Sequence, residues 1–198
     1  RDCSVLRYNP DGSLDTSFGN NGQVLTSFGW DTPDGMSFDF AYAVLAQPDG
    51  KIVAGGESNG RFAVARYNAD GSLDTSFDGD GKVTTGIVVG SSGRALALQA
   101  DGKTVLAGYR YDGQSFAFAV VRYNPDGSLD PTFGANGLAI TPIQGGDALA
   151  YAMAIQPDGK ILVVGVFFGG GQAALVRYHP NGSLDTTFGS GGVVTTSG

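Results

Sequence analysis

The sequence predicts an all-β fold, built from one four-stranded unit that repeats along the chain. Glycine accounts for 33 of the 198 residues and only 16% of residues are charged, which is typical of short strands joined by tight turns. Two short motifs also recur at near-constant spacing, and a fixed period of this kind indicates a repeat architecture. The hydrophobic fraction of 41% is sufficient for a packed core.

The longer motif joins an Arg-Tyr pair to a DGSLD turn and a phenylalanine. Its copies read RYNPDGSLDTSFG, RYNADGSLDTSFD, RYNPDGSLDPTFG and RYHPNGSLDTTFG. They begin at Arg7, Arg66, Arg122 and Arg177, which are 59, 56 and 55 residues apart. The second motif lies between these copies and reads AQPDGKIVAGG from Ala46, QADGKTVLAG from Gln99 and IQPDGKILVVG from Ile155. Each repeat therefore has two halves.

Each half is expected to form a β-hairpin. In the first half, residues 41–47 and 51–56 are β-prone runs on either side of a Pro-Asp-Gly turn, where glycine takes a positive φ. In the second half, residues 61–68 lead through the DGSLD turn into residues 82–87. Four strands in about 56 residues make one propeller blade, and such a sheet buries its faces by stacking on copies of itself. The sequence therefore predicts a β-propeller rather than a solenoid, a sandwich or a helical repeat.

The motif positions divide the chain into a half blade and three whole blades of one domain. The half blade, residues 1–29, holds the two outer strands, and the whole blades cover residues 30–86, 87–143 and 144–198. Fourteen strands fall short of a four-bladed ring, and propellers typically have four to eight blades. We therefore expect a partial ring, either as a fragment of a longer chain or as a homo-oligomer in which several copies share a ring.

These motifs resemble those of a known family. The RYN-x-DGSLD-x-x-FG element paired with A-x-Q-x-DGK-x-x-x-x-G is similar to the delta-60 repeat of bacterial proteins, over essentially the whole chain. The resemblance implies propeller blades in long, often exported or cell-surface proteins, and it implies no catalytic residues. The chain departs from the pattern at Asp78, His179 and Asn181, which leaves the expected fold unchanged.

Residues that are the same in every repeat are expected to serve the structure. An arginine and an aspartate flank each DGSLD turn, as an ion pair or as a carboxylate that accepts turn N–H groups, with a metal ligand as the alternative. The pairs are Arg7/Asp15, Arg66/Asp74, Arg122/Asp130 and Arg177/Asp185. The repeated phenylalanines are expected to fill the gaps between blades, and the repeated tyrosines to be packed with locally bonded hydroxyls. These are Phe18, Phe77, Phe133 and Phe188, and Tyr8, Tyr67, Tyr123 and Tyr178.

The connections on the opposite face of the propeller differ in length and chemistry, so a binding site is expected there. Aromatic and polar side chains on variable loops over a rigid scaffold are the usual components of such a site. The candidate binding residues are Trp30, Tyr109, Arg110, Tyr111, Phe167 and Phe168. The alternative for each aromatic residue is that it only seals its loop.

Composition argues against several partners. The net charge is −7 and the pI is about 4.4, without a basic run, so nucleic acid is not an expected partner. No stretch approaches the roughly 20 apolar residues of a membrane span, and the first ten residues lack the apolar core of a signal peptide. The single cysteine, Cys3, excludes an internal disulfide, and its alternatives are a small buried hydrophobe or an intermolecular disulfide.

No catalytic constellation is evident, so the protein is not expected to be an enzyme. The only histidine, His179, replaces an asparagine beside a repeated turn, and the sequence contains no GxSxG, HExxH or phosphate-loop motif. No metal or organic cofactor is expected. The Asp-rich stretch from Asp74 to Gly81 lacks the alternating carboxylates of a calcium loop, and we interpret it as a turn.

The expected function is that of a structural or interaction module in an exported or cell-surface bacterial protein or assembly. The alternative is a lectin-like propeller that binds a glycan or a protein with its variable face. A second alternative is a propeller lyase or hydrolase with carboxylates around its axis, although the inner strands offer mainly Ala, Val, Leu and Met.

Overall fold

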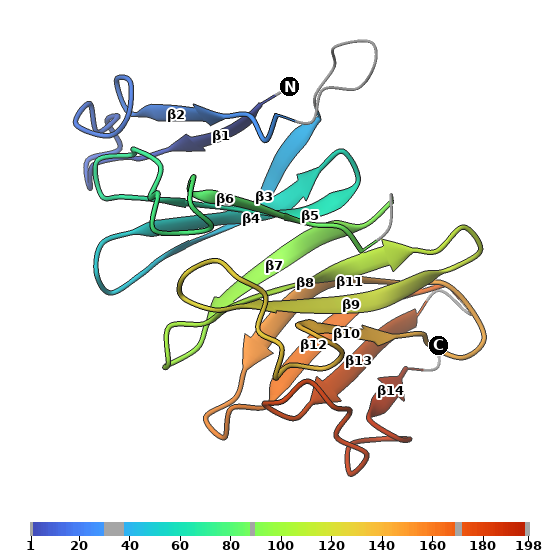
Figure 1. The fold of residues 1–198 in the computed structure, drawn as a ribbon. Helices are drawn as coiled ribbons and strands as arrows, with labels where there is room; N and C mark the ends of the chain where they lie inside the picture. Colours follow the sequence, from blue (N-terminus) through green and yellow to red (C-terminus); the bar gives the residue numbers. More distant parts are fainter. Residues whose placement is uncertain (1, 30–37, 88–89, 169–171, 197–198) are drawn as a thin grey trace.

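The structure is a computed structural model that describes residues 2–29, 38–87, 90–168 and 172–196 (Figure 1). All regular elements in these ranges are β-strands, and they form four antiparallel sheets. The predicted all-β fold of propeller blades in an incomplete ring is confirmed, with three four-stranded sheets and one two-stranded sheet.

The sheets follow one another in chain order. The first holds β1 (Cys3–Leu6) and β2 (Gln23–Thr26). The second holds β3 (Asp39–Ala46), β4 (Ile52–Ser58), β5 (Arg61–Tyr67) and β6 (Lys82–Thr85). The third holds β7 (Ser92–Leu98), β8 (Thr104–Tyr111), β9 (Phe116–Tyr123) and β10 (Leu138–Thr141). The fourth holds β11 (Ala148–Ile155), β12 (Ile161–Phe167), β13 (Gln172–Tyr178) and β14 (Val193–Thr195).

Local turn chemistry explains why consecutive strands pair. In the second blade, Gly50 has a φ of 84°, and the Asp49 carboxylate accepts a hydrogen bond of 3.1 Å from the Lys51 amide. This turn brings β3 and β4 together, and the sheet order β3-β4-β5-β6 repeats the order of the chain. The third and fourth sheets have the same order, which is the meander of a propeller blade.

The hydrophobic core lies between consecutive blades. In Figure 1 the four sheets are stacked from the blue N-terminal sheet to the red C-terminal sheet, with the chain ends on the first and last sheets. Each of three buried clusters combines side chains from two adjacent sheets, such as Phe62 and Val64 of β5 with Val121 of β9. The other two clusters join the first blade to the second and the third to the fourth. Each blade therefore buries apolar side chains against its neighbour.

The two ends of this series remain open. The first sheet has no inner strands, so one edge of β1 is unpaired within the described residues. No helix among the described residues is long and apolar enough to cross a membrane.

Candidate functional site

The repeated Arg-Asp pair forms a compact ionic network in every blade. In the second blade, Arg66 Nε donates to Asp74 Oδ2 over 2.7 Å, and Lys51 Nζ lies 2.8 Å from the same oxygen. Asp74 Oδ1 accepts from the amide and the hydroxyl of Ser76. Burial acts to raise the pKa of Asp74, but the hydrogen bonds from Lys51, Ser76 and Arg66 outweigh it and hold the pKa well below its usual range. The guanidinium also lies 4.7 Å from the centre of the Phe77 ring.

Equivalent ion pairs occur in the other three blades. The Nε–Oδ2 distance is 2.8 Å for Arg7–Asp15, Arg122–Asp130 and Arg177–Asp185. Lys103 and Lys160 approach the third and fourth aspartates at 3.2 and 3.0 Å. Among the described residues, no group of three or more His, Cys, Asp or Glu side chains is arranged to hold a metal ion. Among the described residues, these aspartates form ion pairs with arginine and lysine and accept hydrogen bonds from turn amides.

The same arginine connects its blade to the next one. Arg66 Nη1 donates to the carbonyl oxygen of Pro125 over 2.5 Å, and Arg122 Nη1 donates in the same way to Pro180. Arg7 makes the equivalent bond to the carbonyl oxygen of Ala69. The DGSLD turns of the second and third blades and the equivalent turn of the fourth are therefore the acceptors for the guanidinium of the preceding blade, which gives the repeated turn a role between blades.

A main-chain hydrogen bond accompanies each of these contacts. The amides of Gly19, Asp78 and Gly134 donate to the carbonyl oxygens of Asp70, Asp126 and Asn181, over 2.7, 2.7 and 2.8 Å. In each turn whose carbonyl oxygen accepts this bond, a glycine allows the main chain of the preceding blade to come close. A side chain at Gly127, for example, would lie 2.7 Å from the Asp78 amide nitrogen.

The repeated tyrosines bond between blades, and the expectation of local bonds was wrong. The hydroxyls of Tyr67, Tyr123 and Tyr178 pair with Thr26, Thr85 and Thr141 in the outer strand of the preceding blade, at 2.7, 2.6 and 2.8 Å. Burial raises the pKa of all three phenols. Tyr8 is 59% exposed, contrary to the expectation that it is packed, because no blade precedes it in the structure.

Three of the repeated phenylalanines are completely buried between blades. Phe18, Phe77 and Phe133 each fill a junction, as members of the three core clusters. Phe188 is only half-buried, because no following blade packs against it in the structure.

Three side chains from two blades form a stacked cluster on the variable face. The Arg94 guanidinium of β7 lies 3.7 Å from the centre of the Tyr42 ring, on β3 of the preceding blade. It lies 5.3 Å from the centre of the Tyr109 ring on β8, and Arg94 Nη2 donates to the Tyr109 hydroxyl over 2.8 Å. Burial and the nearby Glu57 carboxylate raise the pKa of Tyr42. The cluster thus joins two exposed or half-exposed aromatic rings to a cation.

A β-bulge that the sequence pattern does not predict places this cluster. The pairing of each inner strand with its neighbour shifts by one residue, at Tyr42 in β3, Arg94 in β7 and Tyr151 in β11. A β-bulge redirects a side chain and is common beside functional sites. The glycine that ends the second motif accommodates the bulge, because a Cβ at Gly56, Gly108 or Gly165 would overlap an inner-strand carbonyl oxygen. That repeated glycine is the sequence signal for the bulge.

Of the expected binding residues, Tyr109 belongs to this cluster and Tyr111 extends it. Tyr109 and Tyr111 lie two residues apart on β8, and their ring centres are 5.6 and 4.7 Å from the ring of Phe116 on β9. Arg110 lies between them in sequence and pairs with Asp112 at 3.3 Å. The Tyr111 hydroxyl donates to the carbonyl oxygen of Gly113. The structure therefore brings Tyr109 and Tyr111 to one aromatic surface and adds Tyr42, Arg94 and Phe116 to it.

The remaining candidates have different surroundings. Phe167 is 7% exposed and belongs to the core between the third and fourth blades, which leaves little of its surface for a ligand. Phe168 is 58% exposed, and its amide donates to the carbonyl oxygen of Asp147. Trp30 lies outside the described residues.

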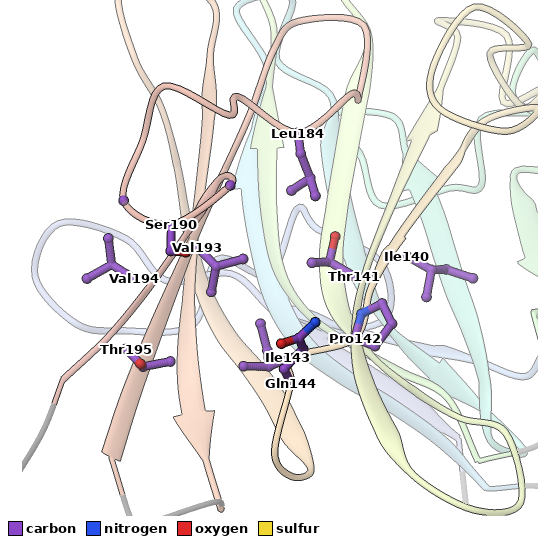
Figure 2. Close-up of a pocket in the computed structure, with 12 residues that line it drawn as sticks. Ile140, Thr141, Pro142, Ile143, Gln144, Leu184, Ser190, Val193, Val194 and Thr195 are labelled. Atoms are coloured by element: carbon purple, nitrogen blue, oxygen red, sulfur yellow. The ribbon is translucent and has the colours of Figure 1, made fainter.

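One groove among the described residues is lined mainly by apolar side chains. It lies between the outer strands of the third and fourth blades and encloses about 670 Å³ (Figure 2). Ile140, Pro142 and Ile143 line one side, and Leu184, Val193 and Val194 line the other. None of its described lining residues is an acid, a lysine, a histidine or a cysteine, so they supply no general acid or general base to activate a hydroxyl group.

The single cysteine and the single histidine both lie within the structural framework of the blades. Cys3 is buried, and burial raises the pKa of its thiol to about 11, which makes it a poor nucleophile near neutral pH. His179 Nε2 lies 3.7 Å from Asp185, in the last ionic network.

Comparison with solved structures shows the fold alone. A crystal structure of a protein of unknown function from Bacteroides caccae matches with a TM-score of 0.53 and 14% sequence identity. The match covers 91% of this chain and 52% of that one, so the chain spans about half the length of that protein. No curated protein matches the sequence.

A family model matches each of the four repeats. The matched segments are residues 1–18, 47–77, 99–133 and 156–188, and the model is described as a domain of unknown function (DUF5122) beta-propeller. These segments contain both repeated motifs and together make up more than half of the chain. The chain therefore belongs to the DUF5122 β-propeller family.

Proposed function

We propose that the chain is a non-enzymatic structural and interaction module of the delta-60 repeat type, in an exported or cell-surface bacterial protein. One observation carries this proposal. The residues that repeat in every blade bond within their blade or to the next one, as Arg66 does with Asp74 and Pro125. The repeated residues thus supply a rigid frame, and the residues that vary are left to contact partners.

Localisation provides the test of this role. An antibody raised against the chain should label intact cells of the encoding bacterium or detect the protein in the culture medium. Labelling only after lysis, in the cytoplasmic fraction, would overturn the proposal. The matched control is an antibody to a cytoplasmic protein, which should label lysed cells alone.

Saccharide binding at the variable face is the second candidate function. The cluster of Tyr42, Arg94 and Tyr109 presents aromatic rings beside hydrogen-bonding groups, with Glu57 close to both Tyr42 and Arg94. Aromatic rings bind the C–H faces of sugars, and charged side chains bind the hydroxyl groups. A mixture of opposite charges in so small an area suits a neutral saccharide better than an anion.

A saccharide array probed with matched variants tests this second function. The wild-type chain should bind a subset of saccharides, and Tyr42→Ala and Tyr109→Ala should each lower the affinity at least about tenfold. Tyr8→Ala is the control, because Tyr8 is an exposed tyrosine far from the cluster in the sequence and on the end blade. Equal binding by all four proteins would place the site elsewhere.

A further inference from the structure

The bulge in each inner strand changes which residues face the preceding blade. The residues of β11 that pack into the core between the third and fourth blades are Ala148 and Ala150 before the bulge, and Met153 and Ile155 after it. Because the alternation passes from even to odd residues at the bulge, Ala150 and Tyr151 both face the third blade. Tyr151 is nevertheless 47% exposed. Its ring therefore projects from the edge of the junction and does not fill it.

Arg94 holds the same position in the third blade. Leu96, two residues further along β7, packs against Gly55 of the second blade and belongs to the core between these blades. Alternation therefore directs Arg94 towards the second blade as well. There it stacks 3.7 Å from the centre of the Tyr42 ring, and Tyr42 is the bulge residue of that blade. One bulge side chain thus reaches the bulge side chain of the preceding blade.

The bulge in β11 repeats this arrangement one blade further on. The strands β7 and β11 are in contact, as β3 and β7 are. The register shift in β11 also falls at the position that is equivalent to the shift in β7. The same register therefore directs Tyr151 towards the third blade, whose bulge carries Arg94. Arg94 and Tyr151 both lie at junctions whose two blades the structure contains.

The bulge side chains project because the residues on either side of them are small. Each bulge lies between glycine or alanine residues, at positions 41 and 43, 93 and 95, and 150 and 152. The residue after the repeated glycine of the neighbouring strand differs in each blade, as Glu57, Tyr109 and Val166. Glu57 lies near Arg94, whereas the exposed Val166 belongs to the same blade as Tyr151. The surface therefore combines charged groups in the second and third blades with apolar contact area in the fourth.

From this arrangement we propose that Tyr151 is a further contact residue of the saccharide site and that the site takes an oligosaccharide. The chain of sugars runs from Tyr42 across Arg94 to Tyr151. Sugar units stack on the two exposed tyrosine rings, and the guanidinium between them binds hydroxyl groups. A single sugar covers one ring, so contact with both tyrosines requires several linked units. The inference rests on the second candidate function, saccharide binding at the variable face.

A series of neutral oligosaccharides of increasing length, from a single sugar to a hexasaccharide, tests the proposal. The wild-type chain should bind the longer members at least about tenfold more tightly than the shorter ones, because only the longer members reach Tyr151. Tyr151→Ala should remove this gain and leave the affinity for the shorter members unchanged. Tyr151→Phe retains the ring and should retain the gain. Titration of each variant with the same series measures the effect of length.

Controls separate the role of Tyr151 from folding and from saccharide binding itself. Tyr8→Ala removes an exposed tyrosine of the first blade and should bind as the wild type does. Circular dichroism verifies that each variant folds, and unchanged binding of the shorter saccharides verifies that the rest of the site is intact. If Tyr42→Ala weakened binding and Tyr151→Ala did not at any length, the inference would be overturned and saccharide binding would stand. A wild-type chain that binds no member of the series would overturn both.

Discussion

The guanidinium of Arg66, in the second blade, donates a hydrogen bond of 2.5 Å to the carbonyl oxygen of Pro125, in the third. Because the same side chain is paired with Asp74, one residue links the ionic network of its blade to the junction with the next. The strength of that link can be measured by comparison with Arg177, which has the ion pair but no following blade in the structure.

Arg66→Ala is therefore expected to destabilise the fold more than Arg177→Ala. Both variants remove an ion pair and leave a lysine beside the aspartate, so the difference reports the contact with the neighbouring blade. We expect a difference of roughly 1–2 kcal/mol in the free energy of unfolding, the cost of a hydrogen bond lost to a charged donor. Urea denaturation of monomeric protein measures it. Equal losses would show that the bond to Pro125 contributes nothing.

The hydroxyl contact between Tyr123 and Thr85 supplies a second measurement at the same kind of junction. Tyr123→Phe retains the buried ring and leaves the Thr85 hydroxyl without its 2.6 Å partner, so a loss of about 1–2 kcal/mol is expected. Tyr8→Phe is the matched control, because the exposed Tyr8 hydroxyl has no hydrogen-bond partner among the described residues. This variant should change stability by less than about 0.5 kcal/mol. Thermal unfolding of both variants under the same conditions decides the comparison.

Stability should also depend on acid, because of the repeated aspartates. The pKa values of Asp74, Asp130 and Asp185 are held well below the ordinary value of 3.8 in the folded chain. A lowered folded-state pKa stabilises the protein above the unfolded pKa, and that contribution is lost as the pH falls towards the folded pKa. The melting temperature should change little between about pH 7 and pH 5 and should decline below about pH 4.

Asp74→Asn tests the assignment of that decline. The variant should be less stable near neutral pH, and its melting temperature should fall less steeply in acid, because one of the linked carboxylates is gone. A wild-type protein whose melting temperature is flat down to about pH 2 would contradict the linkage.

The substitution of Tyr109 and Tyr111 by Ala tests the variable face. It should change the melting temperature little and weaken the binding of any ligand that binds this face.

The repeats predict the architecture because their information is local. A turn such as Pro48-Asp49-Gly50 specifies its own hairpin, and the spacing of the turns gives the number of strands, the missing inner pair and the open ring. The partner of a side chain in the next blade is not local information. Tyr67 and Thr26 are 41 residues apart, and only the stacking of two sheets brings their hydroxyls together.

The bulged inner strands show a second limit of sequence reasoning. Strict alternation of side chains assigns Tyr42 and Arg94 no special position, and a register shift has no signature in their own strands. The signal lies in the neighbouring strand, where Gly56, Gly108 and Gly165 repeat. The stacked cluster was therefore identifiable only once the pairing of those strands was known.

The glycine opposite each bulge yields the last prediction. A Cβ at position 108 would overlap the carbonyl oxygen of Ser92, so Gly108→Ala must displace the inner strand that carries Arg94. Overpacking of this kind costs about 1–3 kcal/mol, and the displacement should also separate Arg94 from Tyr42 and Tyr109.

Gly86→Ala is the matched control, because a Cβ at Gly86 would meet no described atom within 4 Å and the residue has no positive φ. Its stability should be unchanged or higher by up to about 1 kcal/mol, since alanine lowers the entropy of the unfolded chain. Urea denaturation compares the two variants, and tyrosine fluorescence follows the environment of Tyr42 and Tyr109. If Gly108→Ala were as stable as Gly86→Ala and its tyrosine emission matched that of the wild type, the glycine would not be required by the bulge, and the repeated second motif would need another explanation.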